Sequence, residues 1–402
     1  MAECENNCAC SSEEKKKKPK RFIGKKSTGN KTALTTQPTK IVNSIPQALL
    51  EDEYLKELIS ALPSNYNFEI YKSIHQIQQY KPSRIALQFP EGLLVYSTAI
   101  SDIILNFCGV ECLIMGDVTY GACCIDDFTA IALGCDFMIH YGHSCLIPID
   151  TTKIKTLYVF VDIGIDIQHF IDTVKYNVEV GKKICLVGTI QFVGSLGKCV
   201  EGLQGYEVVV PQSRPLSKGE ILGCTAPKIE ADVLVYLGDG RFHLEAIMIA
   251  NPTIEAYRYD PYSKKYTRER YDHQEMYDIR SHAIEQAKKA KKIGLIQGTL
   301  GRQGSPKVMQ YLESVLLEKG IEHVNILLSE IMPEKLSRFK DIDCFVQTSC
   351  PRLSIDWGYA FDKPLLTPYE AAVLFEKTEK WTVYPMDYYA QKSLGPWTPN
   401  HK

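Results

Sequence analysis

The 402-residue sequence lacks any apolar stretch long enough to span a lipid bilayer. Its start, MAECENNCACSSEEKKKKPKRFIGKK, also lacks the apolar core of a secretory signal. A strong net charge is missing too, because 46 Lys and Arg face 48 Asp and Glu, giving −2 at pH 7. A generally basic nucleic-acid binder would carry a clear positive excess. These absences predict a cytoplasmic protein with no membrane contact and no direct binding of nucleic acid.

Several motifs of common metal and nucleotide enzymes are also missing. The sequence has no H-E-x-x-H pair for a zinc hydrolase, which leaves that class a weaker alternative. GTLGRQG (residues 298–304) lacks the G-K-[ST] ending of a loop that binds nucleoside triphosphates. The cysteines of CENNCAC, which are Cys4, Cys8 and Cys10, do not have the C-x3-C-x2-C spacing of common radical S-adenosylmethionine (SAM) enzymes.

Large apolar side chains are scarce in residues 1–44, which are rich in Lys, Ser, Thr and Asn. This composition predicts a disordered tail, with its three cysteines unstructured. KKKKPKR, from Lys15, is typical of a solvated tail, but it also fits a nuclear-import signal and hence a nuclear pool.

Cysteine is abundant, with 14 residues. Because glutathione keeps cytosolic thiols reduced, metal binding or packing is expected rather than disulfides. Six cysteines are in or beside apolar runs and should behave as small hydrophobic residues; they are Cys108, Cys112, Cys135, Cys185, Cys199 and Cys344.

The chain repeats one plan three times, at intervals of about 100 residues. Each repeat has three apolar, β-branched runs that end in small or polar turns and alternate with helix-like segments, a pattern typical of parallel strands with crossover helices. The runs begin at Arg84, Val110 and Cys135, at Lys183, Tyr206 and Ala231, and at Lys292, Glu322 and Ile342. The predicted fold is α/β, with three homologous domains that each contain a small parallel sheet flanked by helices.

The repeats place the domain boundaries. We expect α/β domains at residues 45–175, 176–285 and 286–395, between the tail at 1–44 and a short C-terminal tail at 396–402. Ligands of open α/β sheets bind off the carboxyl ends of the strands, so the turns that close these runs should carry the function.

Each domain presents a cysteine in such a turn. Cys123 and Cys124 lie in GDVTYGACCIDD, Cys224 in GEILGCTAPKI and Cys350 in QTSCPRLSIDWG. If the domains pack around an axis, three thiols converge, which suits a cubane iron–sulfur cluster with one iron free of protein ligands. Spacing alone does not choose between Cys123 and Cys124, and a closed zinc site using Cys145 or His143 stays open. Asp126 and Asp127 should point in different directions and not form an acid/base pair.

These motifs, together with YGHSCLIPID, YLGDGRFHLEA and YRYDPYSKKYTRERYD, resemble the 2-(3-amino-3-carboxypropyl)histidine synthase family, which takes the first step of diphthamide biosynthesis. The resemblance runs from about residue 45 to about residue 395. Three loop cysteines and a lysine-rich tail resemble the subunit 1 branch of the eukaryotic heterodimer. What this implies is a [4Fe-4S] cluster held by Cys123, Cys224 and Cys350, with Cys124 a bystander.

The resemblance also implies a reaction and its partners. The reduced cluster would cleave the Cγ–S bond of SAM, and the 3-amino-3-carboxypropyl radical would add to C2 of a histidine in translation elongation factor 2. Subunit 2 of the same synthase and a small iron protein that donates electrons are the other partners implied. The alternative is a metal-stabilised scaffold that positions a catalytic partner without chemistry of its own.

The sulfonium substrate needs donor groups for its carboxylate and amine. GDGRFHLE places Gly238, Arg241 and His243 just beyond a strand end, where glycine backbone N–H groups can approach a carboxylate. Gln191 and Arg302 occupy analogous positions in the other repeats. All five are predicted cofactor contacts. The aromatic and basic segment at residues 257–273 is expected to be an inter-domain strap or a subunit interface.

Overall fold

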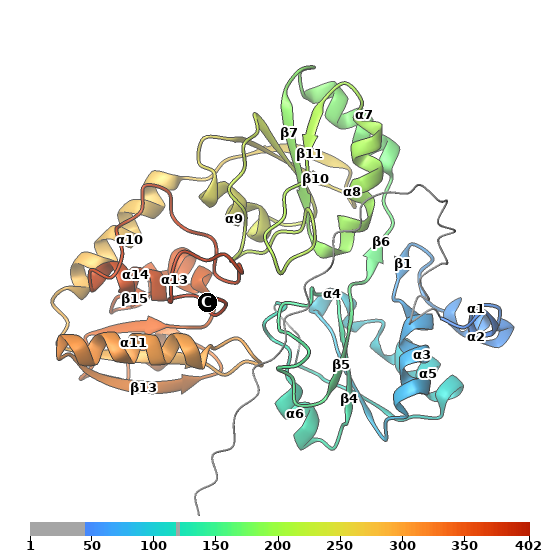
Figure 1. The fold of residues 1–402 in the computed structure, drawn as a ribbon, viewed down its shortest axis with the longest axis horizontal. Helices are drawn as coiled ribbons and strands as arrows, with labels where there is room; N and C mark the ends of the chain where they lie inside the picture. The colour runs from blue at the N-terminus through green and yellow to red at the C-terminus, as the bar shows by residue number, and fades with distance from the viewer. Residues whose placement is uncertain (1–44, 118–120) are drawn as a thin grey trace, which may run out of the picture. The chain divides into compact units, whose positions relative to one another are not determined.

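The computed structural model describes residues 45–117 and 121–402 (Figure 1). The predicted tail at 1–44, with Cys4, Cys8 and Cys10, lies outside the described residues. Residues Ile45–Lys402 form one compact unit.

Three small sheets share one strand order, and each draws on its own stretch of the chain (Figure 1). In each, the first strand lies between the second and the third, and a fourth strand pairs with the third. These four strands are parallel throughout. The α/β fold class and the repetition of one plan are therefore as predicted, although the fourth strands were missed.

The first sheet has the order β3-β2-β4-β5. The strands are β2 (Ile85–Gln88), β3 (Cys112–Ile114), β4 (Phe137–Tyr141) and β5 (Lys155–Val159). Its helices are α1 (Gln47–Leu50), α2 (Glu53–Ile59), α3 (Ile70–Tyr80), α4 (Glu91–Leu94), α5 (Ser97–Cys108) and α6 (Asp127–Ala132). A separate antiparallel pair joins β1 (Tyr66–Asn67) to β6 (Asp162–Ile163).

The second sheet has the order β11-β10-β9-β7-β8. The strands are β7 (Lys183–Gly188), β8 (Glu207–Val209), β9 (Val233–Leu237), β10 (Glu255–Asp260) and β11 (Lys265–Glu269), with helices α7 (Ile167–Asn177), α8 (Ile190–Gly202), α9 (Phe242–Ala250) and α10 (His273–Ala287). The predicted strap at 257–273 is instead largely the antiparallel hairpin β10–β11. Tyr257 and Tyr266 stack across it with ring centroids 5.2 Å apart, because alternating side chains of paired strands share a face.

The third sheet has the order β13-β12-β14-β15. The strands are β12 (Lys292–Gly298), β13 (Glu322–Leu328), β14 (Cys344–Gln347) and β15 (Leu365–Leu366). The helices are α11 (Pro306–Lys319), α12 (Pro333–Leu336), α13 (Pro351–Trp357) and α14 (Pro368–Leu374), with a 3₁₀ turn at Gly358–Ala360.

Burial explains why the apolar runs become central strands. Every residue of β2, β4, β9 and β14 is buried, since helices cover both faces of a parallel sheet. Four of the six cysteines predicted to pack are buried, namely Cys135, Cys185, Cys199 and Cys344, while Cys108 and Cys112 pack at the margin of a core cluster.

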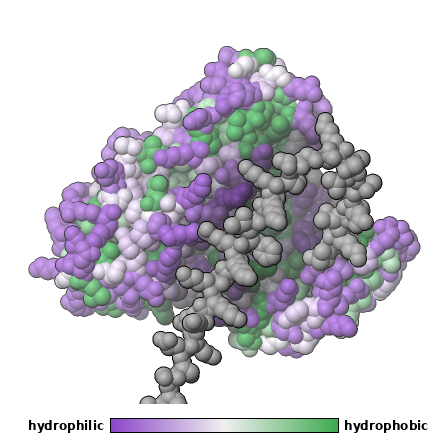
Figure 2. Space-filling view, in the orientation of Figure 1, coloured by the Kyte–Doolittle hydropathy of each residue, from purple (hydrophilic) through white to green (hydrophobic). Residues whose placement is uncertain are grey.

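The predicted boundaries at 175, 285 and 395 stay predictions, since residues 45–402 form one unit. The short terminal segment at 396–402 packs against the fold, with Trp397 and Thr398 buried. No helix in the described ranges is both long and apolar enough to cross a bilayer. On the face shown in Figure 2, hydrophobic residues form small patches among hydrophilic ones.

Candidate functional site

Three cysteines lie in loops that follow strands of the three sheets. Cys123 lies between β3 and α6, Cys224 follows β8, and Cys350, the N-cap residue of α13, lies in the short loop after β14. Because each loop leaves the carboxyl end of its sheet, the three thiols lie at the edges where α/β proteins bind ligands. We call residues 121–126 the Cys123 loop and residues 221–226 the Cys224 loop.

The three thiols share one environment around two buried tyrosines. Cys123 and Cys224 pack against the cluster that contains Tyr388 and Tyr389. Burial raises the pKa of Tyr389 well above its usual range, and the thiol groups of Cys123, Cys224 and Cys350 raise it further. The structure thus brings together the three cysteines that the sequence predicted to converge.

The C-terminal segment joins the Cys224 loop to the third sheet. The Tyr388 backbone N–H donates to the carbonyl of Cys224 (3.2 Å), and its hydroxyl donates to the carbonyl of Thr348 (2.7 Å). The Tyr389 N–H donates to Thr225 Oγ1 (3.0 Å). Sequence reasoning missed these residues, and the only signal was a pair of aromatics in YPMDYYAQ outside any repeated run.

The donor set fits an iron–sulfur cluster. Burial raises the pKa of the Cys224 thiol to about 12, with a further increase from neighbouring Cys350. The hydrogen bond with Cys124, burial, and then the charges of Cys124, Cys224 and Cys350 raise the pKa of Cys123. Thiolates that repel one another in a buried place need a cation, and metal binding releases their protons.

A single metal ion fits less well. In residues 45–117 and 121–402, no three His, Cys, Asp or Glu side chains are placed to hold one ion. A cubane cluster does not require three ligands around one ion, because each thiolate binds a different iron. Cys145 is exposed, so its side chain does not support the zinc alternative.

The two aspartates of the opening motif have separate roles. Asp126 caps α6 by accepting from the Thr129 N–H (3.0 Å). Asp127 is buried and forms two bonds with Arg302, from Nε (2.8 Å) and Nη2 (2.7 Å). They are not an acid/base pair, as predicted.

Most of the predicted cofactor contacts already have protein partners. Arg302 is paired with Asp127. Arg241 is exposed and pairs with Glu245 (3.2 Å) and Glu269 (3.0 Å). Gln191 Nε2 donates to the carbonyl of Gly142 (2.6 Å), which ties α8 to the loop after β4.

Gly238 has a packing reason to be glycine. It follows β9 directly, and a Cβ added there would lie 2.6 Å from the Tyr236 hydroxyl. The predicted approach of its backbone to a carboxylate stays a prediction.

His243 is different, because its Nδ1 is buried with no hydrogen-bond partner among the described residues. The same holds for His143 Nδ1, Thr189 Oγ1 and Ser349 Oγ. His143, Thr189 and Ser349 lie within two residues of the ends of β4, β7 and β14, and His243 is the second residue of α9, in the segment that follows β9. Buried polar atoms are rarely left unpaired, so these strand ends have capacity for a polar ligand.

His143 and His243 should make the stability of the metal-free protein depend on pH. Burial, and then the charge of Arg352, lower the pKa of His243 to about 4. Burial, and then the charge of His243, lower the pKa of His143 to about 4. Unfolded histidine titrates near 6.5, so between about pH 6.5 and 4 the unfolded state binds more protons. We therefore expect the free energy of unfolding to fall as pH decreases through this window.

Denaturant titrations from pH 7 to pH 4 measure this slope, and His143→Asn should reduce it. Buried carboxyls with raised pKa values, such as Asp356 and Asp387, act in the opposite direction and are unchanged in the variant. An identical slope in wild type and variant would contradict the prediction.

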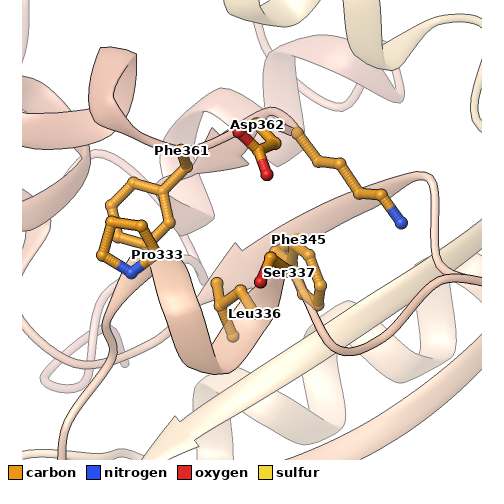
Figure 3. Close-up of a pocket in the computed structure, with 7 residues that line it drawn as sticks. Pro333, Leu336, Ser337, Phe345, Phe361 and Asp362 are labelled. Carbon is orange, nitrogen blue, oxygen red and sulfur yellow. The ribbon is translucent and has the colours of Figure 1, made fainter.

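The small pocket between α12 and β14 is not the site (Figure 3). It is lined by Pro333, Leu336, Ser337, Phe345, Phe361, Asp362 and Lys363. Its volume of about 10 Å³ has room for about one water molecule, far less than a cofactor or substrate needs.

Comparison with known proteins decides the family. The model of the family described as "Putative diphthamide synthesis protein" matches residues 89–386. A relative from Schizosaccharomyces pombe named 2-(3-amino-3-carboxypropyl)histidine synthase subunit 1 is 54% identical, over 97% of this chain and 96% of its own. The chain belongs to the 2-(3-amino-3-carboxypropyl)histidine synthase subunit 1 family. The resemblance noted in the sequence is confirmed.

Further relatives and solved structures agree with this assignment. The Gallus gallus subunit 1 is 58% identical over 89% of this chain and 88% of its own. Among solved structures, Dph2 from Pyrococcus horikoshii with a 4Fe-4S cluster matches with a TM-score of 0.68 and 25% identity, covering 81% of this chain and 94% of that one. A second crystal structure of that protein gives a TM-score of 0.66 at 26% identity.

Proposed function

We propose that this protein is the catalytic subunit of an enzyme that takes the first step of diphthamide biosynthesis. In this reaction a 3-amino-3-carboxypropyl group passes from SAM to C2 of a histidine in translation elongation factor 2. The observation that carries the proposal is that Cys123 and Cys224 pack with Tyr388 and Tyr389, while Arg352, two residues after Cys350, bonds to Gly223 beside Cys224. The family and the cluster-containing Dph2 neighbour support it.

Cys123, Cys224 and Cys350 would hold a [4Fe-4S] cluster and leave one iron without a protein ligand. When bound, such a cluster supplies the electron needed for reductive cleavage of a sulfonium C–S bond. Neutral His143 and His243, with Thr189 and Ser349, offer unpaired polar atoms to the amino and carboxylate groups of the substrate.

The partners follow from the same proposal. The relatives are named subunit 1, which supports a heterodimer with a second subunit of the synthase. We propose elongation factor 2 as the protein substrate, a small iron protein as the electron donor, and the cytoplasm as the compartment.

Iron content tests the cluster and assigns its ligands. The protein would be produced with its partner subunit and purified without oxygen, as wild type and as four cysteine variants. We expect about four irons per cluster in wild type and in Cys124→Ala. Cys123→Ala, Cys224→Ala and Cys350→Ala should each lose this iron, because a thiolate ligand is gone.

Cys124→Ala is the matched control, since Cys124 neighbours Cys123 in the same buried loop. Stoichiometric zinc, or iron that is indifferent to the three cysteines, would overturn the proposal. The scaffold alternative predicts one further difference: methylthioadenosine release would then persist in the three variants, since the partner would do the chemistry.

A further inference from the structure

Two arginines that follow strands of the third sheet each contact one of the other two cysteine loops. We propose that Arg302 and Arg352 are positioning residues that hold the Cys123 loop and the Cys224 loop in place beside Cys350, so that the third sheet organises the cluster site. This inference rests on the proposed cluster. It assigns Arg302 a role other than contact with SAM.

Arg302 holds the Cys123 loop by its side chain and its backbone. Its guanidinium forms two bonds with Asp127, whose side chain is 0% exposed and which begins the helix after the loop. Its backbone N–H donates to the carbonyl of Cys123 (3.0 Å), and its guanidinium carbon lies 3.9 Å from the ring centroid of Phe128. A buried carboxylate without its cation is costly, so the pair resists separation of the two loops.

The backbone of the neighbouring Gly301 packs tightly against the same Cys123 loop. It has φ +56°, and a Cβ added there would lie 2.5 Å from the carbonyl carbon and oxygen of Cys124. The loop after β12 therefore lies directly against the backbone of the Cys123 loop.

Arg352 holds the Cys224 loop in a comparable way. It follows Cys350 by two residues, and its side chain is 2% exposed. Nη1 donates to the carbonyls of Phe242 (2.7 Å) and Gly223 (3.3 Å), the latter being the residue before Cys224. Glu245 (2.6 Å) and Asp356 (2.9 Å) fix the rest of the guanidinium.

One guanidinium thus connects α13, the helix that Cys350 caps, to the backbone beside Cys224. The planar fork of arginine makes these contacts in several directions at once, and lysine has no equivalent geometry. Arg302 bonds to the backbone of Cys123, and Arg352 bonds to the residue before Cys224. Because each bond fixes backbone at or beside a cysteine, it determines where the sulfur atom of that cysteine lies.

The experiment uses the full chain with its partner subunit and measures two quantities. The first is the rate at which an iron chelator bleaches the cluster absorbance. The second is hydrogen exchange of backbone amides in residues 121–126 and 221–226 of the metal-free chain. The variants are Arg302→Gln, Arg352→Gln and the conservative Arg302→Lys and Arg352→Lys.

We expect each glutamine variant to bleach about tenfold faster than wild type, the effect of losing hydrogen bonds to a charged group. Exchange should rise in residues 121–126 for Arg302→Gln and in residues 221–226 for Arg352→Gln. The lysine variants should fall between. Arg302→Gln combined with Asp127→Asn should bleach no faster than either alone, because both remove one contact.

Arg280→Gln is the control for loss of a buried charge: it breaks an ion pair with Glu370, and its other partners, Ser354 and Leu365, lie outside residues 121–126 and 221–226. It should lower thermal stability without selective exchange in those loops. Unchanged hydrogen exchange in the Arg302 and Arg352 variants, or an equal rise of exchange in both loops, would overturn the inference. If a glutamine variant fails to fold, its lysine counterpart decides by the same criteria. If wild type contains no iron, the result counts against the proposed function. The hydrogen-exchange data would still test whether Arg302 and Arg352 hold the two loops.

Discussion

Arg280→Ala is expected to lower the free energy of unfolding by about 3–5 kcal/mol, the range for breaking a buried ion pair by removing one partner. The side chains of Arg280 and Glu370 are 1% and 0% exposed. Two parallel bonds of 2.7 Å join them, and Tyr384 donates to the same carboxylate (2.9 Å). Alanine would leave the carboxylate buried without its cation.

Arg280, which lies on α10, also bonds to α13 and β15 of the third sheet. Nη1 donates to the carbonyl of Ser354 (2.7 Å) and Nη2 to that of Leu365 (2.8 Å), so α10, α13 and β15 share one guanidinium. Chemical denaturation of the metal-free chain measures the effect. Arg84→Ala, which breaks an exposed pair with Glu111, is the control and should change the midpoint little. A comparable loss in both variants would show that burial is not the cause.

Gly301→Ala is expected to abolish cluster retention and to destabilise the chain. A side chain at φ +56° costs about 1–2 kcal/mol by itself. The added Cβ would also lie within 2.6 Å of backbone atoms of Cys124 and Ile125, and backbone cannot rotate away as a side chain can. The two loops must therefore separate, which moves Cys123 from the other thiols.

Gly320→Ala is a closely matched control. Gly320 has φ +66° at the end of α11, and a Cβ there meets nothing within 4 Å. This variant should show only the conformational cost and keep its iron. Iron per chain and the denaturation midpoint, measured on both variants, separate strain from loop displacement. Equal iron in the two would contradict the expected close contact.

Local pattern accounts for the parts of the fold that were predicted. The long runs that became β2, β4, β7, β9, β12 and β14 are apolar on both faces, and burial on both faces of a parallel sheet requires that pattern. The fourth strands were missed because β15 has only two residues and β5 includes the polar Lys155 and Thr156, so neither has a clear period. The segment at 257–273 alternates aromatic and charged residues, which suits a hairpin as well as a strap.

For the site, residue type alone indicated the cysteines, but not the partners of the arginines. Arg241 and Arg302 follow strand ends, where a free cation would suit a carboxylate ligand. Which carboxylate each one meets depends on residues up to 175 positions away in the chain, as for Arg302 and Asp127.

The sequence by itself determined the repeated α/β plan and the three loop cysteines, because strand periodicity and a thiol in a polar turn are local properties. Only the tertiary structure decided that Tyr388 and Tyr389 lie among the thiols, and that Arg302 and Arg352 hold the loops. Those contacts join segments whose sequences show no mutual pattern. Their partners are selected by packing and by the need of each buried charge for an opposite one.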